Sequence, residues 1–253
     1  IGMRRIIALL VMSCFVAGTF AKVPVMGNKI RLTDNWEFLR RDVGNIWELV
    51  RPVKKGQPEE QPIWTKVTLP HCFNAEDAVD PDLNYYQGPG WYKTRLKLDN
   101  PYPDGRVVLE FEGAGQKTDV YVYMTKVGSH VGGYDSWNVD ITDAVRTFLV
   151  SKDAERFGGE IPLSIRCDNT RDAEMIPSDL SDFNLYGGIY RYLNLVYLPE
   201  VSVASLRIEP ALDAKLKKGM LKVSGTFYNP ADVREALVEA VSYTHLTLPT
   251  SDL

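Results

Sequence analysis

The sequence predicts an all-β protein, with a β-sandwich of the jelly-roll type followed by the beginning of a second, incomplete β-sandwich. Three observations support this prediction. Short runs of alternating apolar and polar residues recur between residues 30 and 199, turn-forming glycines and prolines separate them, and helical periodicity is scarce. Many short strands with almost no helix and no internal repeat are typical of a sandwich or jelly roll.

The first 21 residues have the layout of a secretory signal peptide. Two arginines follow Met3, an apolar run covers residues 6–16, and small residues lead up to Ala21. The apolar run is too short to cross a bilayer as a stable helix. We therefore expect cleavage near Ala21, a secreted or periplasmic protein with no membrane span, and a start of translation after residues 1–2. Cys14 loosely resembles a lipoprotein cleavage position, so lipid anchoring is an alternative.

Composition and charge fit an ordinary soluble domain plus part of another. The chain has 253 residues, of which 45% are hydrophobic and 25% charged, and its formal net charge is -4. Because no run of Lys or Arg occurs, we expect no nucleic-acid partner. After cleavage only Cys72 and Cys167 are left, and because nothing in their spacing demands a disulfide, we expect two independent buried thiols; a disulfide, as in other exported domains, is the alternative.

The strand pattern is clearest at residues 92–98. Tyr92, Thr94, Leu96 and Leu98 fall on one face, whereas three basic residues fall on the other. Similar runs, rich in β-branched and aromatic residues, cover 106–111, 118–124, 163–167 and 192–198. Turn signals separate these runs at residues 100–101, 103–105, 113 and 132–133.

One short helix is predicted at residues 140–149. Asp140 provides a capping side chain, and apolar residues follow at roughly helical spacing, namely Ile141, Val145, Phe148 and Leu149.

The predicted domain boundaries divide the mature chain after residue 200. Residues 22–200 form the jelly roll, and residues 201–240 begin a second β-domain with strands near 201–203 and 221–227 and a polar connection over 211–219. About 40 residues cannot complete an immunoglobulin-like sandwich, which needs about 100. Residues 241–253 resemble the translated read-through of a sequencing adapter, and we expect an artefact there; a natural strand is the alternative.

Four sequence blocks resemble the N-terminal sugar-binding domain of glycoside hydrolase family 2, of the β-galactosidase and β-glucuronidase type. They are residues 64–74 (WTKVTLPHCFN), 85–92 (YYQGPGWY), a spaced set over 111–142, and 182–191 (DFNLYGGIYR). They follow the family's order and span most of residues 30–200, which implies a galactose-binding-like jelly roll followed by an immunoglobulin-like domain. One departure is that Tyr123 and Met124 stand where the family has an Asn-Gly turn, which puts that hairpin in doubt.

The resemblance also implies the chemistry. Retaining glycosidases use two carboxyl groups about 5 Å apart, and in this family both are glutamates of a TIM barrel that follows the β-domains, the acid/base lying in an Asn-Glu pair. This sequence has no Asn-Glu pair and no room for a barrel. We therefore expect no catalytic residue, no cofactor and no metal site here, and an inactive chain when it is alone.

The leading hypothesis is the N-terminal fragment of an exported family 2 β-glycosidase. β-Galactosidase ranks first, with β-glucuronidase or β-mannosidase as runner-up. The expected partners are a carbohydrate substrate, bound through the full-length enzyme, and the missing C-terminal domains. Two alternatives stay open: a free-standing secreted carbohydrate-binding module and a structural cell-surface sandwich.

Asp182 is the one substrate-binding residue that the resemblance implies, because the family's loop before Gly-Gly-Ile-Tyr-Arg supplies an aspartate to the edge of the sugar pocket. Its carboxylate would accept hydrogen bonds from sugar hydroxyls. A turn-capping role after Ser181 is the equal alternative, and Asp179 is a weaker candidate.

Other residues favour structural roles. Six aromatic residues are expected in packing more than in a sugar-stacking platform: Tyr85, Tyr86, Trp91, Tyr134, Trp137 and Tyr186. His71 and His130 lack metal-ligand spacing and are expected to make hydrogen bonds in turns. Arg191 is expected to pair with a carboxylate at a domain interface, and residues 88–90 form a turn with no phosphate-binding role, since no helix follows.

Overall fold

A computed structural model describes residues 5–10 (backbone only), 29–52, 63–80, 82, 84–177, 184–213, 219–228 and 232. The chain divides into two compact units. The larger is Ala17–Glu200, and the smaller combines Ile1–Val16 with Val201–Leu253. Strands dominate the described residues of both, which confirms the all-β prediction.

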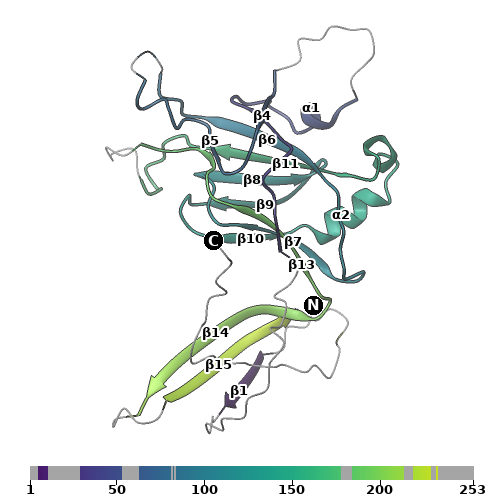
Figure 1. Cartoon of the computed structure of the whole chain (residues 1–253), viewed down its shortest axis with the longest axis vertical. Helices are drawn as coiled ribbons and strands as arrows, with labels where there is room; N and C mark the ends of the chain where they lie inside the picture. The colour runs from purple at the N-terminus through teal and green to yellow at the C-terminus, as the bar shows by residue number, and fades with distance from the viewer. Residues whose placement is uncertain are drawn as a thin grey trace, which may run out of the picture. The chain divides into compact units, whose positions relative to one another are not determined.

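The larger unit contains two antiparallel sheets (Figure 1). The six-stranded sheet has the order β4 (Thr65–Val67), β3 (Trp36–Leu39), β6 (Pro89–Leu96), β11 (Ile161–Asp168), β8 (Lys117–Val122) and β9 (Thr125–Val131). The four-stranded sheet has the order β10 (Trp137–Asp140), β7 (Arg106–Phe111), β13 (Leu193–Leu198) and β2 (Lys29–Arg31). A short pair, β5 (His71–Cys72) with β12 (Gly188–Ile189), lies at one end.

The hydrophobic core is shared by the two sheets, which makes the unit a sandwich. Leu109 and Phe111 from β7 belong to the same buried cluster as Leu163 and Ile165 from β11, and none of the four side chains is exposed. Strand β8 shows why the alternation predicts this arrangement: Thr118, Val120 and Val122 are buried, whereas the residues between them are half-buried. Successive strand residues point to opposite faces, so one face of β8 fills the core.

The predicted helix is present as α2 (Thr142–Leu149). The carboxylate of Asp140 accepts a hydrogen bond from the Thr142 amide at 3.0 Å, but the N-cap position itself is Ile141, one residue later than predicted, and it has no side-chain capping bond. Val145 and Phe148 are buried, but Leu149 is 45% exposed because it turns away from the sheet. Two further short helical segments, α1 (Trp47–Val50) and η1 (Ala154–Phe157), had no counterpart in the sequence pattern.

The hairpin that lacks Asn-Gly nevertheless forms, which corrects the doubt raised by the sequence. β8 and β9 are joined through Tyr123 and Met124, and Tyr123 has a φ of 54°. This region of φ costs a non-glycine residue about 1 kcal/mol or more. Packing of the Tyr123 ring against Phe148 and Phe157, with ring centroids 5.2 and 5.9 Å away, offsets that cost.

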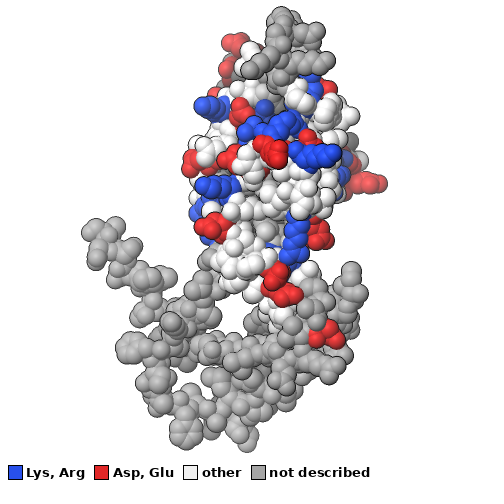
Figure 2. All heavy atoms as spheres, turned by 90° about the vertical axis from the view of Figure 1, so that its right-hand side faces the viewer, with Lys and Arg blue, Asp and Glu red and all other residues white. Residues whose placement is uncertain are grey.

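Charged side chains of both signs are interspersed on the face of the chain shown in Figure 2. Ion pairs between neighbouring strands of the six-stranded sheet include Glu37 with Lys93 at 3.4 Å and Asp119 with Lys126 at 2.7 Å. Cys72 and Cys167, the two cysteines among the described residues, are free; Cys167 is buried, while Cys72 is only half-buried, which differs from the expectation for it.

The smaller unit is a three-stranded antiparallel sheet with the order β1 (Arg5–Leu10), β15 (Gly219–Tyr228) and β14 (Ser202–Leu212). Both predicted opening strands are present and longer than expected, since β14 continues into the predicted connection as far as Leu212. β1 falls within the predicted signal peptide. Most of that peptide, and all of the suspected artefact at 241–253, lie outside the described residues.

Candidate functional site

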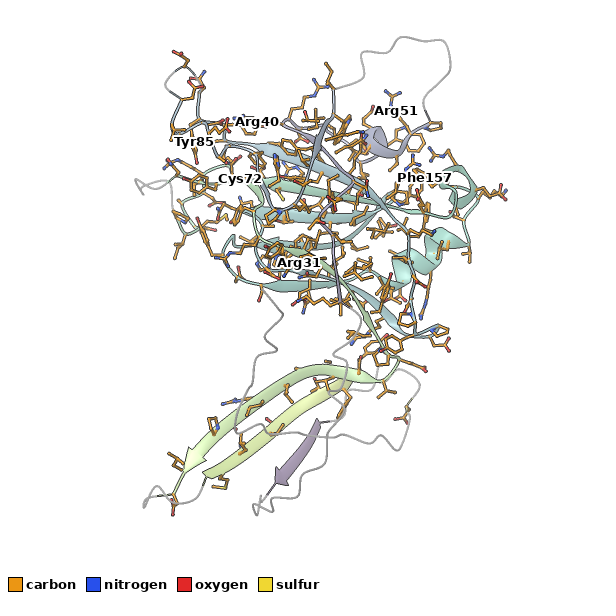
Figure 3. All side chains as sticks on the ribbon, in the orientation of Figure 1. Arg31, Arg40, Arg51, Cys72, Tyr85 and Phe157 are labelled. Carbon is orange, nitrogen blue, oxygen red and sulfur yellow. The ribbon has the colours of Figure 1, made fainter. Side chains whose placement is uncertain are left out.

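Asp182 and Asp179, the two residues predicted to contact sugar, lie outside the described residues. The described residues resume at Asn184, two residues after Asp182. The site is therefore described through the residues that follow Asp182 in the chain. One end of the larger unit, which we call the loop end, is formed by residues 71–77, 84–88, 168–169 and 184–189. Figure 3 shows Arg40, Cys72 and Tyr85 there, and Phe157 at the opposite end of the unit.

Two glycines allow the chain to cross the loop end. β12 pairs with β5, and the Phe73 amide donates to the Gly187 carbonyl at 3.0 Å. A Cβ at Gly187 would lie 2.1 Å from the Phe73 ring, and one at Gly188 would lie 2.5 Å from the His71 carbonyl oxygen. Gly188 also has a φ of 118°, which side chains rarely adopt. The Gly-Gly pair is therefore a packing requirement.

Two fully buried asparagines tie the loops together. Asn74 Nδ2 donates to the Leu185 carbonyl at 2.9 Å and to the Tyr86 carbonyl at 3.4 Å, and Asn169 Nδ2 donates to the same two carbonyls at 2.8 and 3.0 Å. Asn74 Oδ1 accepts from the Gly187 amide at 2.9 Å, and Asn169 Oδ1 accepts from the Gly88 amide at 2.8 Å. Neither asparagine is exposed. Sequence reasoning assigned no role to either; the available signal was a polar residue just after a predicted strand.

Other buried polar groups hold the same loops. The carboxylate of Asp77 pairs with Arg40 and accepts from the Tyr86 amide at 2.9 Å. Gln116, 2% exposed, donates Nε2 to the Tyr186 carbonyl at 3.3 Å. Burial raises the pKa of the Tyr85 hydroxyl to about 12, so this group stays neutral at physiological pH. Its oxygen is buried and has no hydrogen-bond partner among the described residues.

The six aromatic residues divide between packing and exposure. Trp91 is buried and Trp137 stacks on Phe111 at 4.2 Å, while Tyr86 packs its ring on Phe73 and donates its hydroxyl to the Pro89 carbonyl. Tyr85 is half-buried. Tyr134 and Tyr186 are 47% and 41% exposed, so of the six these two are the most open to a ligand.

The histidines make hydrogen bonds as predicted, although both lie on strands and not in turns. His71 Nδ1 lies 2.8 Å from the Tyr92 hydroxyl, and His130 Nε2 lies 3.1 Å from the carboxylate of Asp135. Arg191 Nη1 donates to the Tyr134 carbonyl at 3.0 Å, and its pairing with a carboxylate at a domain interface stays a prediction. Within the described ranges, no group of three or more His, Cys, Asp or Glu residues is arranged to hold a metal ion.

His71 gives the unit a testable pH dependence. Burial lowers the pKa of its imidazole below the usual 6.5, so the unfolded chain takes up a proton at a higher pH than the folded chain. His71 therefore leaves the free energy of unfolding at its full value above about pH 6.5. Below that pH the free energy of unfolding decreases as the pH falls through the lowered pKa of the folded state. We expect the free energy of unfolding, measured by urea denaturation, to fall less between pH 7.5 and 5.5 in His71→Gln than in the wild type.

Between pH 7.5 and 8.5 the two proteins should show the same slope, because neither state of His71 is charged there. An equal loss of stability in both proteins between pH 7.5 and 5.5 would contradict the assignment to His71.

Comparison with known proteins places this fold and loop arrangement in a family. Residues 50–199 match the family model described as glycosyl hydrolases family 2, sugar binding domain. The match covers more than half of the chain, so the chain belongs to glycoside hydrolase family 2, as its sequence blocks predicted.

Individual relatives agree with this assignment. The β-glucuronidase of Parabacteroides merdae is 72% identical with a TM-score of 0.78, covering 85% of this chain and 27% of its own. β-Glucuronidase 3 of Bacteroides uniformis is 62% identical with a TM-score of 0.75, covering 81% of this chain and 26% of its own. A β-galactosidase of Thermoanaerobacter pseudethanolicus is 26% identical over 67% of this chain and 21% of its own.

The chain is short beside these proteins. It spans about a fifth of the length of the curated relatives and about a quarter of the solved β-glucuronidase chains. In the part of the chain that the structure describes, no helix has the length and apolar character needed to cross a membrane.

Proposed function

We propose that this chain is the N-terminal, sugar-binding part of an exported family 2 β-glucuronidase whose catalytic domain is encoded further along the reading frame. The observation that carries the proposal is the 72% identity to the Parabacteroides merdae β-glucuronidase over most of the chain. The β-galactosidase relative, at 26% identity, gives weaker support to the specificity that the sequence analysis ranked first.

In this proposal the domain orients substrate and does no bond-breaking chemistry. The loop end presents Tyr186 at its surface, and the tied segment of residues 185–187 leads back along the chain to Asp182. An aspartate there would accept hydrogen bonds from sugar hydroxyls and so align the sugar ring against catalytic carboxyls supplied by the rest of the enzyme.

The test is to recover the complete reading frame and assay its product, which we call the full-length enzyme. We expect hydrolysis of p-nitrophenyl β-D-glucuronide with a kcat/KM about 100-fold or more above that for the matching galactoside and mannoside, since a site built for a carboxylate rejects sugars that lack one. The 253-residue chain alone should hydrolyse none of the three. A reading frame that stops after one sandwich would favour the carbohydrate-binding module instead, and a preference for the galactoside would overturn the proposed specificity.

We also propose export through the N-terminal signal peptide. Mass spectrometry of the secreted protein should then give a mature chain that begins after Ala21. Such cleavage removes β1 from the sheet that it forms with β15. A mature protein that retains residues 5–10 would contradict export by this route.

A further inference from the structure

A surface that adjoins the loop end combines exposed tyrosine and arginine side chains. Tyr134 is 47% exposed, Tyr192 is 37% exposed, and Arg191 and Arg31 are exposed as well. Arg191 Nη1 donates to the Tyr134 carbonyl, and the Arg31 guanidinium lies 3.6 Å from the centroid of the Tyr192 ring. Glu112 joins the two pairs: its carbonyl accepts from Arg191 at 3.4 Å, and its carboxylate lies 4.0 Å from Arg31. We call Tyr134, Arg191, Tyr192 and Arg31 the Tyr-Arg surface.

The Arg191 side chain is held in place by the backbone around it. Its own amide donates to the Gly113 carbonyl at 3.3 Å, and a Cβ at Gly113 would lie 2.8 Å from Arg191 Cδ. Next to it, Tyr190 donates its hydroxyl to the Gly133 carbonyl at 2.7 Å and so holds the loop that carries Tyr134. A side chain fixed in this way loses little conformational entropy when it binds a partner.

Arg191 has hydrogen-bond donors that the described residues leave unused. A guanidinium has five N–H groups, and both hydrogen bonds of this side chain come from Nη1. Within the described ranges, no carboxylate lies within 4.0 Å of Arg191, and neither Nε nor Nη2 has an acceptor. Nε and Nη2 lie on one edge of the guanidinium and match the two oxygens of a carboxylate. Arg191 therefore presents a bidentate carboxylate-binding edge at an exposed position.

The composition of the Tyr-Arg surface is that of a protein interface. Tyrosine and arginine are enriched among the residues that dominate binding between proteins. Arg31 already has the Glu112 carboxylate beside it, so Arg191 leaves the surface with one unbalanced positive charge, which an acidic partner complements. The chain spans 27% of the length of the Parabacteroides merdae β-glucuronidase, so in the proposed full-length enzyme most of the polypeptide lies outside this chain.

We propose that the Tyr-Arg surface is the docking surface for the catalytic part of the same polypeptide, and that Arg191 binds an aspartate or glutamate carboxylate of that part through Nε and Nη2. The rings of Tyr134 and Tyr192 add apolar area that becomes buried, while Arg191 fixes the register of the contact. This inference rests on the proposed function, because the partner is the part that the full-length enzyme supplies.

The main test compares the reaction of individual arginines with phenylglyoxal, read by mass spectrometry, in the 253-residue chain and in the full-length enzyme. We expect Arg191 to react about tenfold more slowly in the full-length enzyme, because docking excludes water from it and occupies its guanidinium.

Arg146 is the matched control within the same experiment. It is also exposed, and its Nη2 donates to two carbonyls, those of Asp104 at 3.2 Å and Gly105 at 3.1 Å. It lies on α2, outside the Tyr-Arg surface, so its reaction rate should be the same in the two proteins.

A substitution separates carboxylate binding from simple coverage. Arg191→Lys keeps the positive charge but cannot present two parallel donors. We expect it to lower the Tm of the N-terminal domain by about 2–4 °C in the full-length enzyme and by less than about 1 °C in the 253-residue chain, because only the former contains the carboxylate. Arg146→Lys should shift the Tm equally in both. An equal shift from Arg191→Lys in the two proteins would contradict the carboxylate contact.

The outcomes distinguish failure of the docking surface from failure of the proposed function. Equal reactivity of Arg191 in both proteins, in an enzyme that hydrolyses its glycoside, would overturn the docking surface alone. Protection that appears in the 253-residue chain as its concentration rises would identify a second copy as the occupant. Protection by free glucuronate, with Arg191 still reactive in the full-length enzyme, would identify a sugar carboxylate; either result overturns the proposal. A reading frame that stops after one sandwich would overturn both.

Discussion

Replacing Phe111 with alanine is expected to lower the free energy of unfolding of the chain by about 3–5 kcal/mol, the usual cost of deleting a buried aromatic ring. Phe111 is not exposed at all and lies on β7, between β10 and β13. Its ring stacks on Trp137 with centroids 4.2 Å apart and planes 4° apart. The substitution removes the ring and leaves a cavity at the centre of the sandwich, so urea denaturation followed by circular dichroism should show a much earlier transition.

Ile30→Ala is the control for Phe111→Ala. Ile30 lies on the edge strand β2 and is 45% exposed, so its truncation should change the free energy of unfolding by no more than about 0.5 kcal/mol. A loss below about 1 kcal/mol for Phe111→Ala would mean that the two sheets do not share the core described above.

Asp182→Asn in the full-length enzyme is expected to lower kcat/KM for an aryl β-D-glucuronide by about 10- to 150-fold. Hydrogen bonds to a charged group are worth about 1.5–3 kcal/mol, and each 1.4 kcal/mol corresponds to a tenfold change in rate. The amide keeps the size of the carboxylate but loses its charge and replaces one acceptor with a donor. Thermal unfolding measured in parallel should change little, because the expected role is in substrate binding.

Asp153→Asn provides the matched comparison for Asp182→Asn. Asp153 pairs with Arg156 at 3.6 Å and adjoins η1, which contains Phe157, at the opposite end of the larger unit from Tyr85 (Figure 3). This variant should retain wild-type kcat/KM. If Asp182→Asn also retains it, Asp182 is a turn-capping residue and the proposed sugar contact is wrong.

Much of the fold follows from local patterns. The run at 106–111 predicts β7 with the bounds observed, and Asp140 with the apolar residues after it predicts α2. The pattern at 118–124 placed the end of β8 two residues too late, since the chain turns at Tyr123. The sequence put that turn in doubt because Tyr123 and Met124 replace Asn-Gly. Its ring contacts with Phe148 and Phe157, which are distant in the sequence, could not be predicted from the local pattern.

The predicted sugar contact at Asp182 stays a prediction, because this residue lies outside the described residues. The sequence blocks pointed to the loop before the Gly-Gly pair, and the described residues on its C-terminal side are indeed tied to the end of the sandwich. Asn169 lies in none of the four blocks, and Asn74 ended a block without an assigned role. The carbonyls that Arg191 binds within the unit become its neighbours only when the chain folds.

The sequence by itself determined the strand-rich class, the order of the strands along the chain and the family, because alternation and turn chemistry are properties of neighbouring residues. Only the tertiary structure decided which buried amides hold the loop end. Asn74 binds a carbonyl 111 residues away, and Asn169 binds an amide 81 residues away. A hydrogen bond requires donor and acceptor within about 3 Å, and no local pattern states which distant groups the sheets will bring that close.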